Sequence, residues 1–473
     1  MSGRNYFAGK MEEMIHRLAE FVEIPTVYDK KEKDAPFGKE IKKGLDYLEK
    51  LGRDMGFNTV NHQNYALEIQ AGDPDVRQEN TLGIVCHMDV VPAGNGWKTD
   101  PFHMEIKDGK MYGRGTVDDK GPLIASLYAM KYLKEYQKIP KDKKIIMIVG
   151  TDEEENFQGI KYFGERNEFP AFSFIPDGNF PLIYGEKGML DFDLSCSFKR
   201  DEKAAAKVLR LVGGSGRNMV PDHAECLMEC IETEKEKLLE KAKRAAQMQE
   251  DHSYKITLQE RRLKVECMGK SAHAMSPEKG KSAVAGLFSC LKNMGKAVDM
   301  HEFISKYFYS IGEDCTGNKL GVAMEDTDSG ILTFNVGKVQ LSDRFCAHCN
   351  IRYPMTAQPE KTVEIIQKAL EERGFEVQIT EHLKPVNFSK DEEHLKKLLL
   401  AYRKITGDTQ TQPITIGGAT YTRFVPNSVA FGPVYADQEE LAHEPNEFLE
   451  IRQFLELAEI YSEALECLMK EEK

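Results

Sequence analysis

Apolar runs and helical repeats alternate along the first part of the chain. Three short apolar runs each stop at a polar cluster: TLGIVCH at 81–87, KKIIMIVGTDE at 143–153 and FSFIPDG at 172–178. Between the first two, ASLYAMKYLKEY at 125–136 carries apolar residues at helical spacing. This alternation predicts an α/β domain with a mixed, largely parallel sheet and helices on both faces.

The pattern changes after GEKG at 185–188. MLDFDLSCSF at 189–198 alternates as an antiparallel strand does, and the segment 232–251 has the composition of a long, charged helix. After a linker at 384–394, the alternation of strands and helices of the first part resumes with a strand, SVAFGP, and a final helix. We therefore expect a catalytic domain in two parts, 1–185 and 383–473, with an α+β lid domain inserted at 186–382.

Composition and charge remove several classes of function. No run approaches the 18 to 20 apolar residues that a membrane span needs, and a net charge of −13 argues against a nucleic-acid partner. The N-terminus reads as an amphipathic helix without the apolar core of a secretion signal. Ten cysteines are scattered without the dense spacing of a disulfide framework, which indicates a reducing compartment. We expect a cytoplasmic protein.

Candidate chemical groups follow the predicted strands. Ligands bind beyond the carboxyl ends of the strands in such sheets, and His87, Glu153, Glu154 and Asp177 all fall there. Asp89, two residues after His87, could accept a ring N–H of the imidazole and so fix its tautomer. Each of these residues alone has an ordinary structural explanation, such as a packed histidine or an acidic turn.

Two further segments add to this set. GRGTVDDKGP at 113–122 places Asp118 and Asp119 just before a predicted helix, and helix capping explains one of the two acids better than both. LAHEPNE at 441–447 places His443 in a loop. Two histidines and several carboxylates at one sheet edge can hold two divalent ions; zinc suits these ligands best, with manganese or cobalt as alternatives.

In this order, the motifs HMDVVP, GRGTVDDKGP, GTDEEE, PDG and LAHEPNE resemble those of the zinc aminoacylase and carboxypeptidase-G family of metallopeptidases. FPLIYGEKG, NMVPDHAE and IGGATYTRFVPNSVAFGP are similar to segments of its dipeptidase V subgroup, also called Xaa-His dipeptidases or carnosinases. These motifs extend from about residue 80 to 450. The resemblance covers nearly the whole chain.

The resemblance implies a role for each candidate at the sheet edge. Asp119 would bridge the two ions. His87 and Asp177 would complete the shell of one ion, and Glu154 and His443 that of the other. Asp89 would orient His87, and Glu153 would serve as the general base.

The resemblance also implies substrate contacts from the lid. His273 would stabilise the oxyanion, Asn218 would grip the substrate, and Arg352 would meet its C-terminal carboxylate. Gly417 and Gly418 would bring backbone N–H groups to the same carboxylate. The enlarged lid of the subgroup implies a monomer.

These roles together describe a dipeptidase that hydrolyses the amide bond of dipeptides with a free N-terminus. The alternative within the same chemistry is an N-acyl-amino-acid hydrolase, which has no use for a free substrate amine. A non-catalytic binding protein on the same scaffold is disfavoured, because the proposed base and ligands are all present.

Overall fold

The computed structural model describes residues 3–249 and 251–470. The chain forms two compact units, one of residues 1–185, 388–415 and 419–473, the other of residues 186–387 and 416–418. No helix in the described part of the chain is long and apolar enough to span a membrane.

The first unit is built on a nine-stranded mixed sheet in the order β1-β2-β6-β3-β7-β21-β8-β19, with β20 beside β8. Four neighbouring strands, β6, β3, β7 and β21, are parallel, and β1 with β2, β2 with β6 and β21 with β8 pair antiparallel. The strands are β1 (Asn58–Asn61), β2 (Ala66–Gly72), β3 (Thr81–His87), β6 (Lys144–Gly150), β7 (Phe172–Ile175), β8 (Ile183–Glu186), β19 (Val386–Asn387), β20 (Ile414–Ile416) and β21 (Ser428–Ala430).

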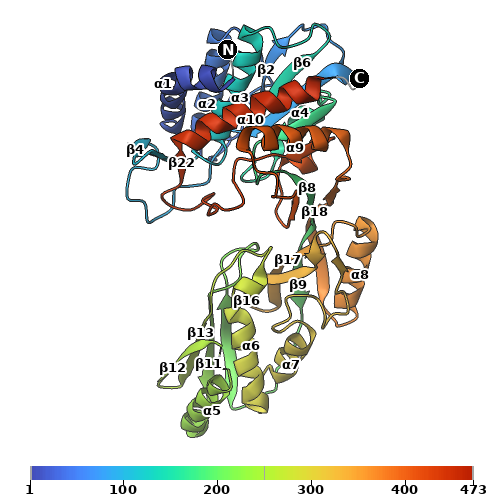
Figure 1. The fold of residues 1–473 in the computed structure, drawn as a ribbon. Helices are drawn as coiled ribbons and strands as arrows, with labels where there is room; N and C mark the ends of the chain where they lie inside the picture. The colour runs from blue at the N-terminus through green and yellow to red at the C-terminus, as the bar shows by residue number, and fades with distance from the viewer. Residues whose placement is uncertain (1–2, 250, 471–473) are drawn as a thin grey trace. The chain divides into compact units, whose positions relative to one another are not determined.

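Helices cover both faces of this sheet. α1, α3 and α10 pack against one another (Figure 1). α3 and α10 also lie on β3. On the other face, a cluster that includes Val85, Ile146 and Ile148 packs on Ile160 and Phe163 of α4. The helices are α1 (Gly3–Val22), α2 (Lys39–Asp54), α3 (Lys120–Glu135), α4 (Gln158–Gly164), α9 (Glu393–Thr406) and α10 (Ile451–Met469). A small sheet, β22-β5-β4, joins Phe448–Glu450, Lys110–Tyr112 and Glu105–Lys107.

The second unit, which we call the lid, contains an eight-stranded antiparallel sheet in the order β12-β13-β11-β10-β16-β17-β9-β18. Its apolar core lies on one face, where α5, α6, α7 and α8 supply buried side chains. The strands are β9 (Gly188–Cys196), β10 (Ala206–Gly213), β11 (His223–Cys230), β12 (Ser253–Gln259), β13 (Arg262–Met268), β16 (Thr333–Leu341), β17 (Phe345–Tyr353) and β18 (Glu376–Leu383). The helices are α5 (Lys235–Gln247), α6 (Ala283–Met294), α7 (His301–Ser310) and α8 (Pro359–Glu371), and a short hairpin joins β14 (Glu325–Asp326) to β15 (Gly330–Ile331).

The predicted fold class is confirmed. The three apolar runs of the first part form β3, β6 and β7, all fully buried because helices cover both faces of the sheet. The alternating run after GEKG forms β9, whose burial alternates because one of its faces lies against the core. The charged segment forms a helix shorter than expected, α5, preceded by a single 3₁₀ turn.

Candidate metal centre

The carboxyl ends of three adjacent parallel strands bring the candidate residues together. β3 ends at His87, β6 is followed by Glu153 and Glu154, and β7 is followed by Asp177. β3 pairs with β6 on one side and β7 on the other, in parallel register. Side chains that are separated by 90 residues along the sequence therefore meet at one sheet edge.

Asp118 lies at the centre of this group. Its Oδ1 is 2.8 Å from Nε2 of His87, and its Oδ2 is 3.3 Å from Nε2 of His443. Nε2 of His443 is also 2.9 Å from Oε2 of Glu154, and Nε2 of His87 is 3.8 Å from Oδ2 of Asp177. The cluster thus has two halves, and the two oxygens of Asp118 belong to different halves.

The donor atoms lie close enough together to hold metal ions. One ligand atom each from His87, Asp118 and Glu154 lie within 4.8 Å of one another, and the same is true of His87, Glu153 and Asp177. Imidazole nitrogens combined with carboxylate oxygens suit zinc and related divalent ions. The residues at this sheet edge therefore fit a metal centre.

The geometry favours Asp118 as the shared carboxylate, whereas the resemblance pointed to Asp119. Asp119 is fully buried, and its Oδ2 accepts the backbone N–H of His87 at 3.2 Å. It stands at the N-cap of α3 without a side-chain capping hydrogen bond. The peptide bond between the two aspartates is cis. Asp119 thus supports the strand end, while the Asp118 carboxylate faces both imidazoles.

Asp89 holds the His87 ring in place. Nδ1 of His87 lies 3.0 Å from the backbone oxygen of Asp89 and 3.6 Å from its Oδ1. Oδ2 of Asp89 accepts the backbone N–H of Glu154 at 3.0 Å. Because a carbonyl oxygen only accepts, Nδ1 carries a proton, and loss of the second ring proton would free Nε2 to bind a metal ion. Asp89 therefore links the two strand ends that supply His87 and Glu154.

Crowding of the carboxylates perturbs their protonation. Burial and the nearby Asp118 charge raise the pKa of Asp177 to about 7, and burial raises the pKa of Glu153 well above its usual range. Hydrogen bonds to two carboxylates raise the pKa of His443 to about 11. Burial alone would raise the pKa of Asp118, but hydrogen bonds from His443 and His87 lower it. Cations at this edge would relieve the repulsion among the carboxylates.

A buried ion pair fixes the loop that carries Asp118. Oε1 of Glu447 accepts the backbone N–H groups of Val117 at 2.7 Å and Asp118 at 3.3 Å. Its Oε2 accepts from the N–H of Gly115 at 3.0 Å and from Nη1 of Arg114 at 2.9 Å. The sequence analysis missed Arg114 and Glu447. Their only signal was their place in the GRG and PNE parts of the two loop motifs.

Within the lid, the residues expected to contact the substrate include two pairs of neighbours, Asn218 with the His273 segment and Arg352 with Gly417. The backbone oxygen of Asn218 accepts the N–H of Ala274, next to His273, at 2.7 Å. Nη1 of Arg352, in β17, donates to the backbone oxygen of Gly417 at 3.1 Å. Gly417 therefore offers its carbonyl to the guanidinium, in addition to the backbone N–H expected from the sequence.

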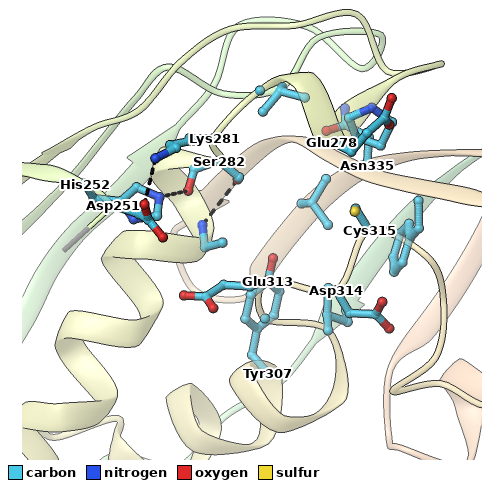
Figure 2. Close-up of a pocket in the computed structure, with 18 residues that line it drawn as sticks. Asp251, His252, Glu278, Lys281, Ser282, Tyr307, Glu313, Asp314, Cys315 and Asn335 are labelled. Atoms are coloured by element: carbon cyan, nitrogen blue, oxygen red, sulfur yellow. Dashed lines mark hydrogen bonds and ion pairs between the residues drawn. The ribbon is translucent and has the colours of Figure 1, made fainter. Parts of the chain in front are cut away.

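The lid also contains a cavity of about 230 Å³, lined in part by Tyr307, Cys315 and Asn335 (Figure 2). Four carboxylates line it as well. That of Asp251 is paired with Lys281 at 2.7 Å, and that of Asp314 accepts backbone N–H groups of its own loop.

Comparison with known proteins supports a peptidase. The model of peptidase family M20/M25/M40 matches residues 83–466. A Staphylococcus epidermidis protein named "Putative dipeptidase" is 35% identical over 471 residues, covering 97% of this chain and 98% of that protein. A Bacillus subtilis protein, "Putative dipeptidase YtjP", is 33% identical over 473 residues, covering 98% of each.

Solved structures share the fold at low sequence identity. Human carnosine dipeptidase 1 aligns with a TM-score of 0.58 at 15% identity, covering 99% of this chain and 98% of that one. Aminoacylhistidine dipeptidase from Vibrio alginolyticus aligns with a TM-score of 0.53 at 14% identity, covering 96% of each chain.

We predict that Glu447→Ala destabilises the protein by about 3–5 kcal/mol, because it leaves Arg114 buried without its counter-charge and frees the loop that carries Asp118. Chemical denaturation measures the change. Glu450→Ala, three residues further on, removes a half-exposed carboxylate that is 4.0 Å from Lys110 and should cost less than about 0.5 kcal/mol. Equal effects of the two substitutions would contradict the structural role of Glu447.

Proposed function

Because the chain belongs to the M20/M25/M40 peptidase family, a family of metallopeptidases, we propose that it is a binuclear metal-dependent dipeptidase of the dipeptidase V type. Its substrates would be dipeptides with a free N-terminus. The observation that carries the proposal is the Asp118 carboxylate, whose two oxygens face the imidazoles of His87 and His443. A carboxylate shared in this way suits a pair of ions rather than a single one.

We assign the ligands by halves of the cluster. His87 and Asp177 would hold one ion, Glu154 and His443 the other, and Asp118 both. When bound, such ions lower the pKa of a water molecule and polarise the carbonyl of the scissile amide. Zinc fits the mixed nitrogen and oxygen donors best, and manganese or cobalt are the alternatives.

Glu153 would act as the general base. It lies with His87 and Asp177 in one group of close ligand atoms, yet among the described residues it makes no ion pair with either histidine. Its carboxylate would take a proton from the attacking water and deliver it to the amide nitrogen as the C–N bond breaks. The products are two amino acids, one with a new carboxylate and one with a new amine.

The lid would supply the contacts that select the substrate. Arg352 would bind the C-terminal carboxylate in a charge-assisted pair, His273 would stabilise the oxyanion, and Asn218 would grip the peptide. The backbone of Gly417 and Gly418 would lie at the same carboxylate. We further propose that the protein is a cytoplasmic monomer, with the enlarged lid supplying these contacts from its own chain.

Glu153→Gln is expected to retain its metal while turnover falls about 100-fold or more, because glutamine cannot accept the proton. Metal analysis together with initial rates on a dipeptide measures both effects. Loss of metal in proportion to loss of activity would make Glu153 a ligand instead.

Asp118→Asn should weaken the binding of both ions together, whereas Asp119→Asn should retain more metal, because only Asp118 faces both imidazoles. The measurement is metal content per chain after dialysis, with Asp119→Asn as the matched neighbour. If Asp119→Asn lost both ions and Asp118→Asn kept them, the bridging role would return to Asp119.

Dipeptides should be cleaved, while tripeptides, C-terminally amidated dipeptides and N-acetylated dipeptides should react slowly. A blocked or displaced carboxylate leaves Arg352 without its partner, at a cost of about 2–5 kcal/mol, or roughly tens to thousands of fold in kcat/KM. In Arg352→Ala, the preference for the free carboxylate should disappear. Faster cleavage of the N-acetylated substrate than of the free dipeptide would support an N-acyl-amino-acid hydrolase.

A further inference from the structure

Two buried asparagines lie directly across from each other in the lid sheet. Asn335 of β16 and Asn350 of β17 are register partners, and they are 4% and 1% exposed. Arg352 lies two residues beyond Asn350 on the same face of β17 and is 5% exposed. A buried amide needs hydrogen-bond partners, and those of both asparagines lie beside residues of the proposed substrate site.

The side chain of Asn350 holds the guanidinium of Arg352. Its Oδ1 accepts from Nε of Arg352 at 3.0 Å, and its Nδ2 donates to Oδ1 of Asp191 in β9. Arginine can only donate and an ionised aspartate can only accept, so these two partners fix the orientation of the amide. Neither leucine nor aspartate at this position could satisfy both neighbours.

The side chain of Asn335 holds the loop on which Asn218 lies. Its Nδ2 donates to the backbone oxygens of Arg217 and Met219, each at 2.9 Å. Both N–H bonds of the amide are thereby used, one on either side of Asn218. The loop also lies directly on β16, since a Cβ at Gly337 would come within 2.2 Å of the backbone oxygen of Gly216.

The same loop is joined to the segment of His273. Met219 and His273 form an isolated β-bridge, and the N–H of Val220 donates to the oxygen of Ala272 at 2.8 Å. A displacement of the loop would therefore be transmitted to His273. The two hydrogen bonds of the Asn335 side chain thus fix the backbone that carries Asn218 and is joined to His273.

We propose that Asn350 and Asn335 are positioning residues for dipeptide hydrolysis, Asn350 acting through Arg352 and Asn335 acting through Asn218 and His273. This inference rests on the proposed function. It adds that the two kinds of substrate contact are set by one cross-strand amide pair. It also predicts that the two asparagines affect different kinetic constants.

Asn350→Leu should raise KM for a dipeptide about ten- to a hundredfold with little change in kcat, because a misplaced Arg352 weakens ground-state and transition-state binding alike. Asn335→Leu should mainly lower kcat, by a similar factor, because His273 would act on charge that develops in the transition state. In the Arg352→Ala background, Asn350→Leu should change kcat/KM less than threefold, because its effect runs through the removed side chain.

Thr333→Val is the matched control. Thr333 is 4% exposed, pairs in register with Arg352, and has a hydroxyl without a hydrogen-bond partner among the described residues. Losing this hydroxyl should leave KM and kcat within about twofold of wild type. If the substitutions only weakened the sheet, KM and kcat would change in Asn350→Leu, Asn335→Leu and Thr333→Val alike. Thermal denaturation of each variant distinguishes such a loss of stability from a change in positioning.

Hydrogen exchange of the substrate-free, metal-loaded enzyme tests whether the Asn335 side chain holds the Asn218 loop, without relying on turnover. Asn335→Leu should speed exchange in segments 214–220 and 272–274 about tenfold or more, and Thr333→Val should not. Unchanged exchange would overturn the role of Asn335. Additive effects of Asn350→Leu and Arg352→Ala on kcat/KM would overturn the role of Asn350.

If the wild type cleaves no dipeptide, the proposed function fails. The exchange result then decides whether Asn335 holds the loop, and the claim that Asn350 positions Arg352 for dipeptides falls with the proposed function. If the wild type cleaves dipeptides but Asn350→Leu behaves as Thr333→Val does, the proposed function stands and the inference about Asn350 fails.

Discussion

The structure of the first unit depends on placing several carboxylates and two imidazoles at one buried sheet edge. Asp118 faces His87 and His443, with Glu154 and Asp177 beside them. Such crowding is unfavourable unless cations or protons neutralise the charges. The surrounding framework must therefore hold these groups in place. Adjacent parallel strands supply three of the segments, and a buried ion pair fixes a fourth.

That ion pair illustrates how the remote parts of the chain are joined. Arg114 and Glu447 are separated by more than 300 residues, yet both are buried and Glu447 accepts three backbone N–H groups of the Asp118 loop. The carboxylate thereby satisfies donors that would otherwise be buried without partners. Because Glu447 follows His443 in the same loop, one segment supports both the Asp118 loop and His443 at the candidate metal centre.

In the lid, neutral amide side chains, not an ion pair, hold the residues of the proposed substrate site in place. Asn350 meets a guanidinium and a carboxylate, and Asn335 meets two backbone oxygens. An amide carries both a donor and an acceptor without a net charge, so it can be buried at low electrostatic cost. The hydrogen bonds to Asn350 and to the carbonyl of Gly417 then set the orientation of the Arg352 guanidinium.

The sequence by itself determined the fold class and the group of residues at the sheet edge, because continuous apolar runs and the polar residues after them are local features. Spacing alone gave no ground for choosing between Asp118 and Asp119, which are adjacent and chemically identical, and the resemblance pointed to Asp119. Only the tertiary structure turned one carboxylate toward both imidazoles and the other toward the backbone of His87. Nor could the sequence reveal Glu447 or the Asn335–Asn350 pair, because their partners come from distant segments and depend on loop contacts and strand register.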